Sequence, residues 1–175
     1  MRALVVYESM YGNTHVLADA IGDGLAERYQ VAVVPVDRAA GQVLEEADLL
    51  VVGGPTHVHG MSRATTRQAA VVDARKPDSA LTVAPDAEGP GLRDWLAGLP
   101  KTLRARAAAF DTRIDMPAIL TGRAGKGITG QLRKHGMTMV AEPQSFLVTK
   151  QNILEPGEAD RARQWGRRLA GAGGD

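Results

Sequence analysis

YESMYGNT, residues 7–14, follows the apolar run Leu4–Val6 and precedes a stretch in which apolar residues recur at helical spacing. The segment therefore joins an expected buried strand to an expected amphipathic helix. It carries Ser, Asn and Thr side chains, which offer hydroxyl and amide donors, and Gly12, which permits a tight turn. The start of the following helix adds free N–H groups and the positive end of its dipole. The segment predicts a phosphate site that needs no Lys or Arg.

Helix capping by Asn13 or Thr14 is the alternative interpretation of this segment, because Asn and Thr are common at helix starts without any ligand. Capping explains one or two of these residues but not the whole run, so phosphate binding is favoured. Two common nucleotide motifs do not fit the chain. Gly22-x-Gly24 lies inside the expected helix, and Gly125-Lys126 is followed by Gly127 where the Walker loop has Ser or Thr.

Short apolar runs rich in β-branched residues predict the strands of a sheet. Each run is too short for a helix, and its apolar residues are consecutive, which is typical of strands buried on both faces. The runs are residues 3–7, 31–36, 49–52, 107–110, 137–140 and 146–148. Segments with helical spacing lie around residues 17–28, 92–99 and 159–169. The pattern predicts an α/β fold with a parallel sheet covered by helices.

Length and composition indicate one domain. The chain has 175 residues, of which 44% are hydrophobic, and this suffices for a single core. We expect the domain over residues 1–170 and a flexible tail at residues 171–175. Residues 76–91, with three prolines and two glycines, are expected as a long irregular connection and not as a domain boundary.

Charge and cysteine content exclude several classes of protein. The net charge of +1 does not indicate nucleic acid or a membrane surface as a partner. The absence of cysteine excludes disulfides, thiolate nucleophiles and Cys-ligated metal centres, so redox chemistry requires a bound organic cofactor. Neither a signal peptide nor an apolar run long enough for a membrane span is found, and we expect a cytoplasmic protein.

A second candidate loop, GGPTHVHGMS at residues 53–62, follows the apolar run 49–52. Pro55 stiffens the turn, and the glycines allow the backbone to approach a ligand closely. His57, Val58, His59 and Met61 offer flat or polarisable surface to a ring system. Because ligands bind at the carboxyl ends of strands in open parallel sheets, both loops are expected at one site.

The two segments SMYGNT and GGPTHVHGMS resemble those of the flavodoxins and flavodoxin-like proteins, whose first loop has the pattern Ser/Thr-x-x-Gly-x-Thr. The resemblance extends over nearly the whole chain in element order, and AEPQSFLV and RARQWGRRLA look like flavodoxin C-termini. It implies a doubly wound sheet of five parallel strands in the order 2-1-3-4-5, with helices on both faces. It also implies flavin mononucleotide at the switch between strands one and three.

The resemblance also implies which residues contact the flavin. The first loop would surround its phosphate, the second would lie against its ring, and the segment after the fourth strand would close the other side. These residues are Ser9, Met10, Tyr11, Gly12, Asn13 and Thr14; Pro55, Thr56, His57, Val58, His59 and Gly60; and Phe110, Asp111, Thr112 and Arg113. For Phe110, burial as the last residue of its strand is the favoured interpretation.

The chain departs from flavodoxins in two respects. Only 4% of its residues are aromatic, and the second loop offers His57 and His59 where flavodoxins usually stack Trp or Phe on the flavin, so modest flavin affinity is expected. Flavodoxins are also typically acidic. Residues 101–134 instead contain eight basic residues and two acidic ones, an excess of +6 that could attract an acidic partner or the phosphates of NADPH, or simply form a solvated face.

Other chemistry has little support in the sequence. His57-x-His59 lacks a third metal ligand nearby, so no metal site is expected. Asp111 is more readily a turn or cap residue than an acid or base, and no catalytic residue is assigned.

The leading hypothesis is an FMN-binding electron-transfer protein whose partner is a redox protein or NAD(P)H. The alternatives are an NAD(P)H-dependent quinone reductase or oxidase of the same fold, and a flavodoxin-shaped binding or regulatory domain that has lost its flavin.

Overall fold

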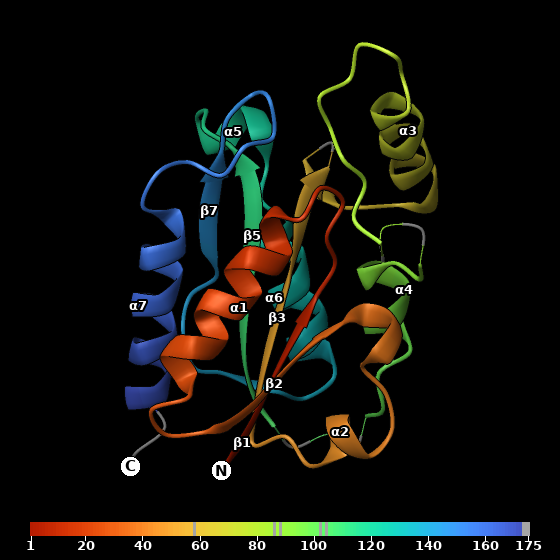
Figure 1. The fold of residues 1–175 in the computed structure, drawn as a ribbon. Helices are drawn as coiled ribbons and strands as arrows, with labels where there is room; N and C mark the ends of the chain where they lie inside the picture. The colour runs from red at the N-terminus through yellow and green to blue at the C-terminus, as the bar shows by residue number, and fades with distance from the viewer. Residues whose placement is uncertain (58, 86, 88, 102, 104, 173–175) are drawn as a thin grey trace.

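A parallel sheet forms the centre of the computed structural model, which describes the whole chain except residues 58, 86, 88, 102, 104 and 173–175 (Figure 1). Its strands are β2 (Gln30–Pro35), β1 (Arg2–Tyr7), β3 (Leu49–His57) and β5 (Arg106–Ile114), in that spatial order. Two short strands, β6 (Thr138–Met139) and β7 (Gln144–Val148), both pair in parallel with β5. The expected order 2-1-3-4-5 is confirmed, with the fifth position divided between β6 and β7.

Helices cover both faces of this sheet. Helices α1 (Asn13–Leu25) and α7 (Glu158–Gly171) pack on one face, and α6 (Ala124–Lys134), α4 (Leu92–Ala97) and the short α2 (Gln42–Glu45) pack on the other. Helix α3 (Ala64–Ala74) stands beyond the carboxyl end of β3 (Figure 1). The remaining helical segments are η1 (Val36–Arg38) and α5 (Ala118–Thr121). Among the helices described, none has the length and apolar character that crossing a membrane requires.

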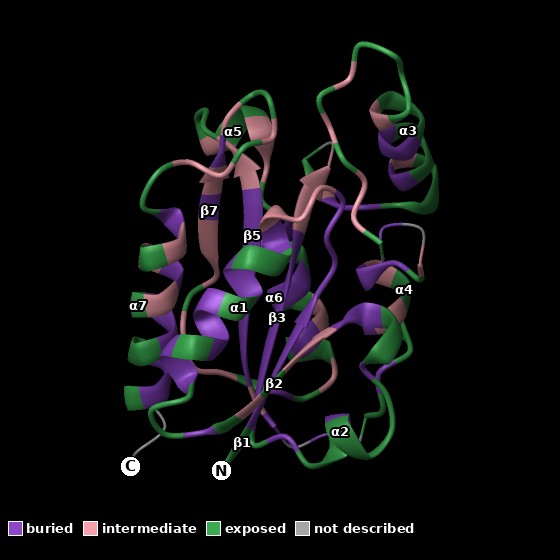
Figure 2. Cartoon of the chain, viewed as in Figure 1, coloured by how far each residue is buried: buried purple, intermediate pink, exposed green. Residues whose placement is uncertain are grey.

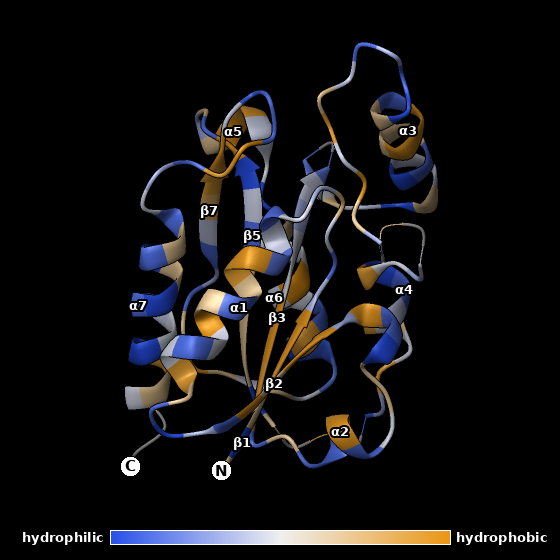
Figure 3. Ribbon diagram, viewed as in Figure 1, coloured by the Kyte–Doolittle hydropathy of each residue, from blue (hydrophilic) through white to orange (hydrophobic). Residues whose placement is uncertain are grey.

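The strands are buried because alternate side chains enter two separate cores. Leu4 and Val6 of β1 face the core under α4 and α6, whereas Val5 and Tyr7 face the core under α1 and α7. Consecutive apolar residues are therefore all buried, as expected for a sheet covered on both sides. Figures 2 and 3 show buried, apolar strands between helices whose outer surfaces are exposed and polar.

Two segments expected as loops are strands. β3 continues through Gly53 and Gly54 to His57, then pairs with β4 (Gly60–Met61) in an antiparallel hairpin. The expected loop 110–113 is likewise part of β5. The apolar pattern ends before these residues, but neighbouring strands supply pairing partners: Gly53 aligns with Tyr7 and Phe110, and Gly54 aligns with Asp111. Because these partners come from distant parts of the chain, local sequence did not indicate the extension.

Candidate functional site

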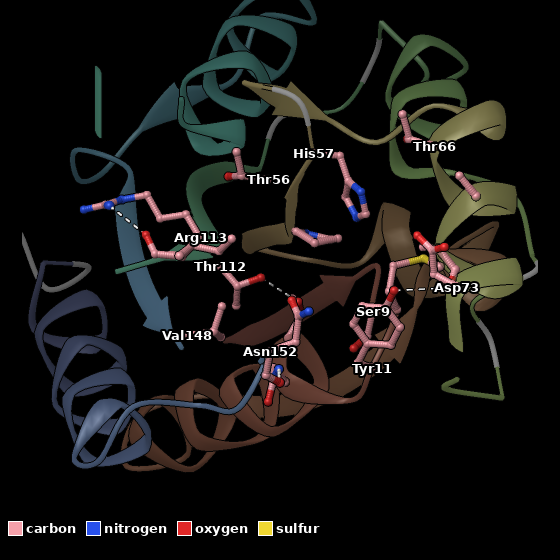
Figure 4. A pocket seen from close by; sticks show the side chains of 17 residues that line it. Ser9, Tyr11, Thr56, His57, Thr66, Asp73, Thr112, Arg113, Val148 and Asn152 are labelled. Atoms are coloured by element: carbon pink, nitrogen blue, oxygen red, sulfur yellow. Dashed lines mark hydrogen bonds between the residues drawn. The ribbon is translucent and has the colours of Figure 1, made fainter. Parts of the chain in front are cut away.

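A cavity of about 370 Å³ opens at the carboxyl ends of β1, β3 and β5. Its volume lies within the range of small-molecule sites. The position is the switch point of the sheet, because β2 lies on one side of β1 and the later strands lie on the other. Figure 4 shows side chains from the loop after β1, from the ends of β3 and β5, from α3 and from the loop before α7 directed into it.

The loop after β1 delivers an uncapped helix start to this cavity. Gly12 adopts a positive φ of 88°, and its N–H donates to the Ser9 Oγ at 3.1 Å, which closes the turn. Gly12 occupies the N-cap position and has no side chain. Among the described residues no side chain caps α1, so the alternative interpretation, capping by Asn13 or Thr14, is wrong. The first-turn N–H groups keep their hydrogen-bonding capacity for another acceptor.

The side chains of Asn13 and Thr14 connect this helix start to other elements. The Thr14 Oγ1 lies 3.2 Å from the Thr112 Oγ1 at the end of β5, and the Asn13 amide donates to the Asn152 carbonyl at 2.6 Å. Thr14 is buried, and Asn152 has the positive φ of 59° that Asn tolerates better than most residues. These contacts hold the helix start, the β5 end and the loop before α7 in one arrangement.

Tyr11 and α3 form one wall of the cavity. The Tyr11 hydroxyl donates to the Ala70 carbonyl at 3.2 Å, and Met10 packs with Ala70 and Val71. The pKa of Tyr11 is raised by burial and by the nearby negative charge of Asp73. The phenol is therefore neutral at physiological pH, and its ring is held in place by its bond to α3.

His57 lies across the cavity from Tyr11, at the end of β3 (Figure 4). Burial lowers its pKa, the negative charge of Glu8 opposes this shift, and the positive charge of Arg67 adds to it. Glu8 is itself buried and accepts a hydrogen bond from the Leu92 N–H at 2.7 Å. A lowered histidine pKa means that His57 is a neutral imidazole at pH 7, with one donor and one acceptor nitrogen.

The structure brings most of the expected site residues together. The cavity is lined by Ser9, Met10, Tyr11, Asn13 and Thr14, by Pro55, Thr56 and His57, and by Thr112 and Arg113. Gly12 shapes the turn beside it. His59 and Gly60 line a neighbouring hollow across the β3–β4 hairpin, and Val58 lies outside the described residues.

Phe110 and Asp111 do not line the cavity, so the contact with a flavin ring that the resemblance implied for them is corrected, and the burial favoured for Phe110 is confirmed. The Phe110 side chain is fully buried and packs edge-to-face against Phe146 and Trp165, at centroid distances of 6.2 and 6.3 Å. Asp111 faces the opposite side of β5, where it accepts a hydrogen bond from the Gly125 N–H at 2.6 Å. Burial raises the pKa of Asp111. Of the four residues 110–113, Thr112 and Arg113, nearest the carboxyl end of β5, line the cavity.

Several lining residues were missed by the sequence interpretation. Thr66, Ala69, Ala70 and Asp73 come from α3, and Ile114, Val148 and Asn152 come from the ends of β5 and β7 and the loop beyond. None belongs to a recognisable motif, and only the docking of α3 and the 149–155 loop brings them to the first loop. The described residues contain no cluster of His, Asp and Glu that could hold a metal ion.

Comparisons with known proteins agree with this geometry. The model of the flavodoxin family matches residues 5–84. A flavodoxin from Archaea is 22% identical with a TM-score of 0.64, covering 98% of this chain and 97% of its own. Flavodoxin 2 from Bacillus cereus is 17% identical with a TM-score of 0.66, covering 98% and 99%. Rubredoxin oxygen:oxidoreductase from Desulfovibrio gigas is 18% identical with a TM-score of 0.62, and the match covers 98% of this chain but 35% of that one. No curated protein sequence matches significantly.

Proposed function

Because the chain is a flavodoxin-like protein, we propose that it binds flavin mononucleotide (FMN) in the cavity at the switch point and transfers electrons. The flavodoxin family binds flavin. When bound, the flavin supplies the redox chemistry by accepting and releasing electrons. The electrons would arrive from a partner reductase or from NAD(P)H.

The observation that carries this proposal is the uncapped start of α1 at the edge of the cavity. Its free N–H groups and helix dipole favour a phosphate, and the Ser9 and Thr14 hydroxyls add further polar groups. A phosphate at this position would satisfy donors that no side chain of the described chain satisfies. The residues present therefore fit the phosphate of FMN.

The residues of the cavity walls can hold the flavin ring, but we expect their contribution to the affinity to be moderate. Tyr11 and His57 provide flat surfaces, and both are neutral at pH 7 for the reasons given above. Trp95 and Trp165 do not line the cavity; Trp165 belongs to α7 and is buried in the core between this helix and the sheet, and the Trp95 indole N–H donates to the Ala39 carbonyl at 2.6 Å. The site has no tryptophan to stack on a flavin, so the phosphate contacts are expected to carry a large share of the affinity.

Absorbance spectroscopy tests the proposal directly. The purified protein, freed of any bound flavin, is titrated with FMN and in parallel with riboflavin, which lacks the phosphate. We expect FMN to bind, its bands to bleach with dithionite, and riboflavin to bind more weakly by at least about tenfold, which corresponds to about 1.4 kcal/mol. Absence of FMN binding would contradict the proposal, and equal affinities would contradict the phosphate role of α1.

Adding NADH or NADPH to the FMN-loaded protein distinguishes the two electron sources. Bleaching of the flavin without any added reductase would indicate direct reduction by the nicotinamide. Bleaching that requires a reductase would indicate a protein partner.

A further inference from the structure

A second hollow of about 690 Å³ lies across the β3–β4 hairpin from the FMN cavity. Its walls come from the hairpin, from α4, from α5 and from the first turn of α6. The hairpin connects the two sites, because His57 lines the first cavity and His59, two residues later, lines the hollow. The FMN proposal leaves the residues of the hollow unused.

The walls of the hollow are held together by close backbone contacts. His59 has a φ of 69°, which is unusual for a residue other than glycine. It pairs with Gly122 in an isolated bridge, and a Cβ on Gly122 would lie 2.3 Å from the His59 Cα. The Ala124 N–H also donates to the Thr56 Oγ1 at 3.0 Å. These contacts hold the β3–β4 hairpin against the segment that connects α5 to α6, at the rim of the hollow.

Positive charge is concentrated in this hollow. Arg93, Arg123 and Lys126 line it, and no Asp or Glu is among the described residues that do so. The Arg93 guanidinium is held by the Met61 and Ser62 carbonyls, with Nη2 to oxygen at 2.9 Å and Nε to oxygen at 3.3 Å. Among the described residues, none of the three cations forms an ion pair with a carboxylate. The buried Asp111 carboxylate attracts Arg123 and offsets part of this positive charge. The repulsion that remains among the three cations would be relieved by an anion bound between them.

The rim of the hollow is apolar on the α5 side. Ile119 lines the hollow with 88% of its surface exposed. Met61 and Ala118 add further apolar lining. Three cationic side chains next to the exposed Ile119 can bind a ligand that has an anionic group and an apolar portion.

We propose that this hollow is a binding site for a small anionic molecule that carries a phosphate or carboxylate group and an apolar portion. The anionic group contacts Arg93, Arg123 and Lys126, and the apolar portion covers Ile119. The inference is independent of flavin binding, since it rests on residues that the first cavity does not contain. Its position next to His57 would bring such a ligand close to the edge of the proposed flavin site.

Calorimetric titration at an ionic strength of about 0.15 M, where the Debye length is about 8 Å, tests the anionic half of the proposal, with pyrophosphate and citrate as probes. The variant R123Q/K126Q removes two cations from the hollow. The control R133Q/K134Q removes the same charge from exposed residues at the other end of α6. We expect the first pair to weaken binding by about tenfold or more and the control pair to change it by less than about twofold, because charges beyond a Debye length are screened. Preference for pyrophosphate identifies a phosphate ligand, and preference for citrate identifies a carboxylate.

The first cavity must be excluded as the source of the signal. The titrations are therefore repeated with FMN present in excess, which occupies the phosphate site at the start of α1, and binding of the probes to the hollow should persist. Equal losses in the two charge-matched pairs, loss of probe binding when FMN is in excess, or binding of neither probe would overturn the proposal. Because the titrations are run with and without FMN, a failure of flavin binding can be distinguished from a failure of anion binding in the hollow.

The apolar half is tested with 1-naphthyl phosphate. Ile119→Ser should weaken its binding by about fivefold, because about 1 kcal/mol of apolar contact is lost, and should leave pyrophosphate binding unchanged. Equal effects on both probes, or no effect on 1-naphthyl phosphate, would contradict the assignment of Ile119. Ile119 is so exposed that the substitution is not expected to impair folding.

Discussion

Thr14 combines burial with two polar roles. It stands in the first turn of α1, its Oγ1 lies 3.2 Å from that of Thr112, and it lines the proposed phosphate site. A hydroxyl in this position can bond to Thr112 and to a phosphate oxygen at once, because it carries one donor and two acceptor sites. The residue therefore couples the helix start to β5 at the point where the ligand would bind.

Thr14→Val should weaken FMN binding by about 1 to 3 kcal/mol, or about 5- to 150-fold, because a phosphate oxygen loses its hydroxyl partner. Quenching of FMN fluorescence in a titration measures the change. Thr138→Val, at an exposed position of β6 far from the site, is the matched control and should bind FMN as the unaltered protein does. Unchanged affinity in Thr14→Val would remove Thr14 from the site.

Glycine is required at position 12 because of the backbone conformation there, and not because a larger side chain would meet other atoms. A Cβ on Gly12 would meet nothing within 4 Å, but its φ of 88° is unfavourable for any L-residue. Gly12→Ala should lower the free energy of unfolding by about 1 to 2 kcal/mol. Gly130→Ala, inside α6 and also without contacts, should raise it by up to about 1 kcal/mol. Urea denaturation measures both, and a loss of stability in both variants would argue against the backbone explanation.

Helix α7 is attached to the sheet through the carboxylate at its start. Glu158 accepts a hydrogen bond from the Leu147 N–H of β7 at 2.7 Å and pairs with Arg161 at 2.5 Å. The Arg161 guanidinium in turn lies 4.4 Å from the centre of the Phe146 ring. Burial by itself would raise the pKa of Glu158, but the hydrogen bonds from Arg161 and Leu147 outweigh it, and the pKa lies below its ordinary value of 4.5.

Glu158→Gln should therefore destabilise the protein in a pH-dependent manner. A carboxyl whose pKa is lower in the folded state contributes stability above pH 4.5 and loses it as pH falls through the folded-state value. We expect a loss of about 1 to 3 kcal/mol at pH 7 that shrinks towards pH 3. Urea denaturation across this range, with Glu45→Gln on the exposed surface of α2 as control, measures it. A loss that is constant with pH would contradict the role of the charge.

Helices α1 and α7 approach closely because glycines face each other at their contact. A Cβ on Gly166 would lie 2.3 Å from the Ile21 carbonyl oxygen, and one on Gly24 would lie 2.1 Å from the Arg163 carbonyl oxygen. Both obstacles are backbone atoms, which cannot move aside as a flexible side chain can. The glycines thus set the distance between the two helices that cover this face.

Gly166→Ala should lower the free energy of unfolding by about 1 to 3 kcal/mol, because α7 must shift away from α1. Gly171→Ala, at the end of the same helix and with nothing within 4 Å, should change it by less than about 0.5 kcal/mol. Denaturant midpoints measure both. Equal effects would show that loss of helical glycine, and not the contact, determines the result.

The whole molecule is organised around a sheet with one core on each face and a ligand cavity at the carboxyl ends of its central strands. The cavity wall combines the loop after β1, the β3 and β5 ends, α3 and the loop before α7, so a bound ligand would connect elements from most of the chain. A ligand that binds the folded state and not the unfolded state stabilises the fold by mass action.

FMN at about one hundred times its dissociation constant should stabilise the fold by about 2.7 kcal/mol and raise the unfolding temperature by about 5 to 10 °C. Thermal unfolding followed by circular dichroism at increasing FMN measures the shift. At the same FMN concentration, Thr14→Val should show a smaller shift. An unfolding temperature that does not depend on FMN would contradict binding to the folded state.

By itself, the sequence determined the α/β class, the buried parallel strands and the polar turn from Ser9 to Thr14, because these depend on local pattern and turn chemistry. The flavodoxin resemblance added the strand order, which the structure confirms. It also named most of the residues that line the cavity.

Only the tertiary structure decided where the strands end and which side chains meet. β3 and β5 extend past their apolar runs because neighbouring strands complete their hydrogen bonds. Phe110 and Thr112 share one face of β5, and Phe110 packs in the core whereas Thr112 reaches the cavity because Thr112 lies two residues nearer the carboxyl end of the strand. α3 and Asn152 reach the site, and Arg93 joins Arg123 and Lys126 in the hollow, from distant positions in the chain. Such contacts arise from packing between elements, which no local pattern of residues records.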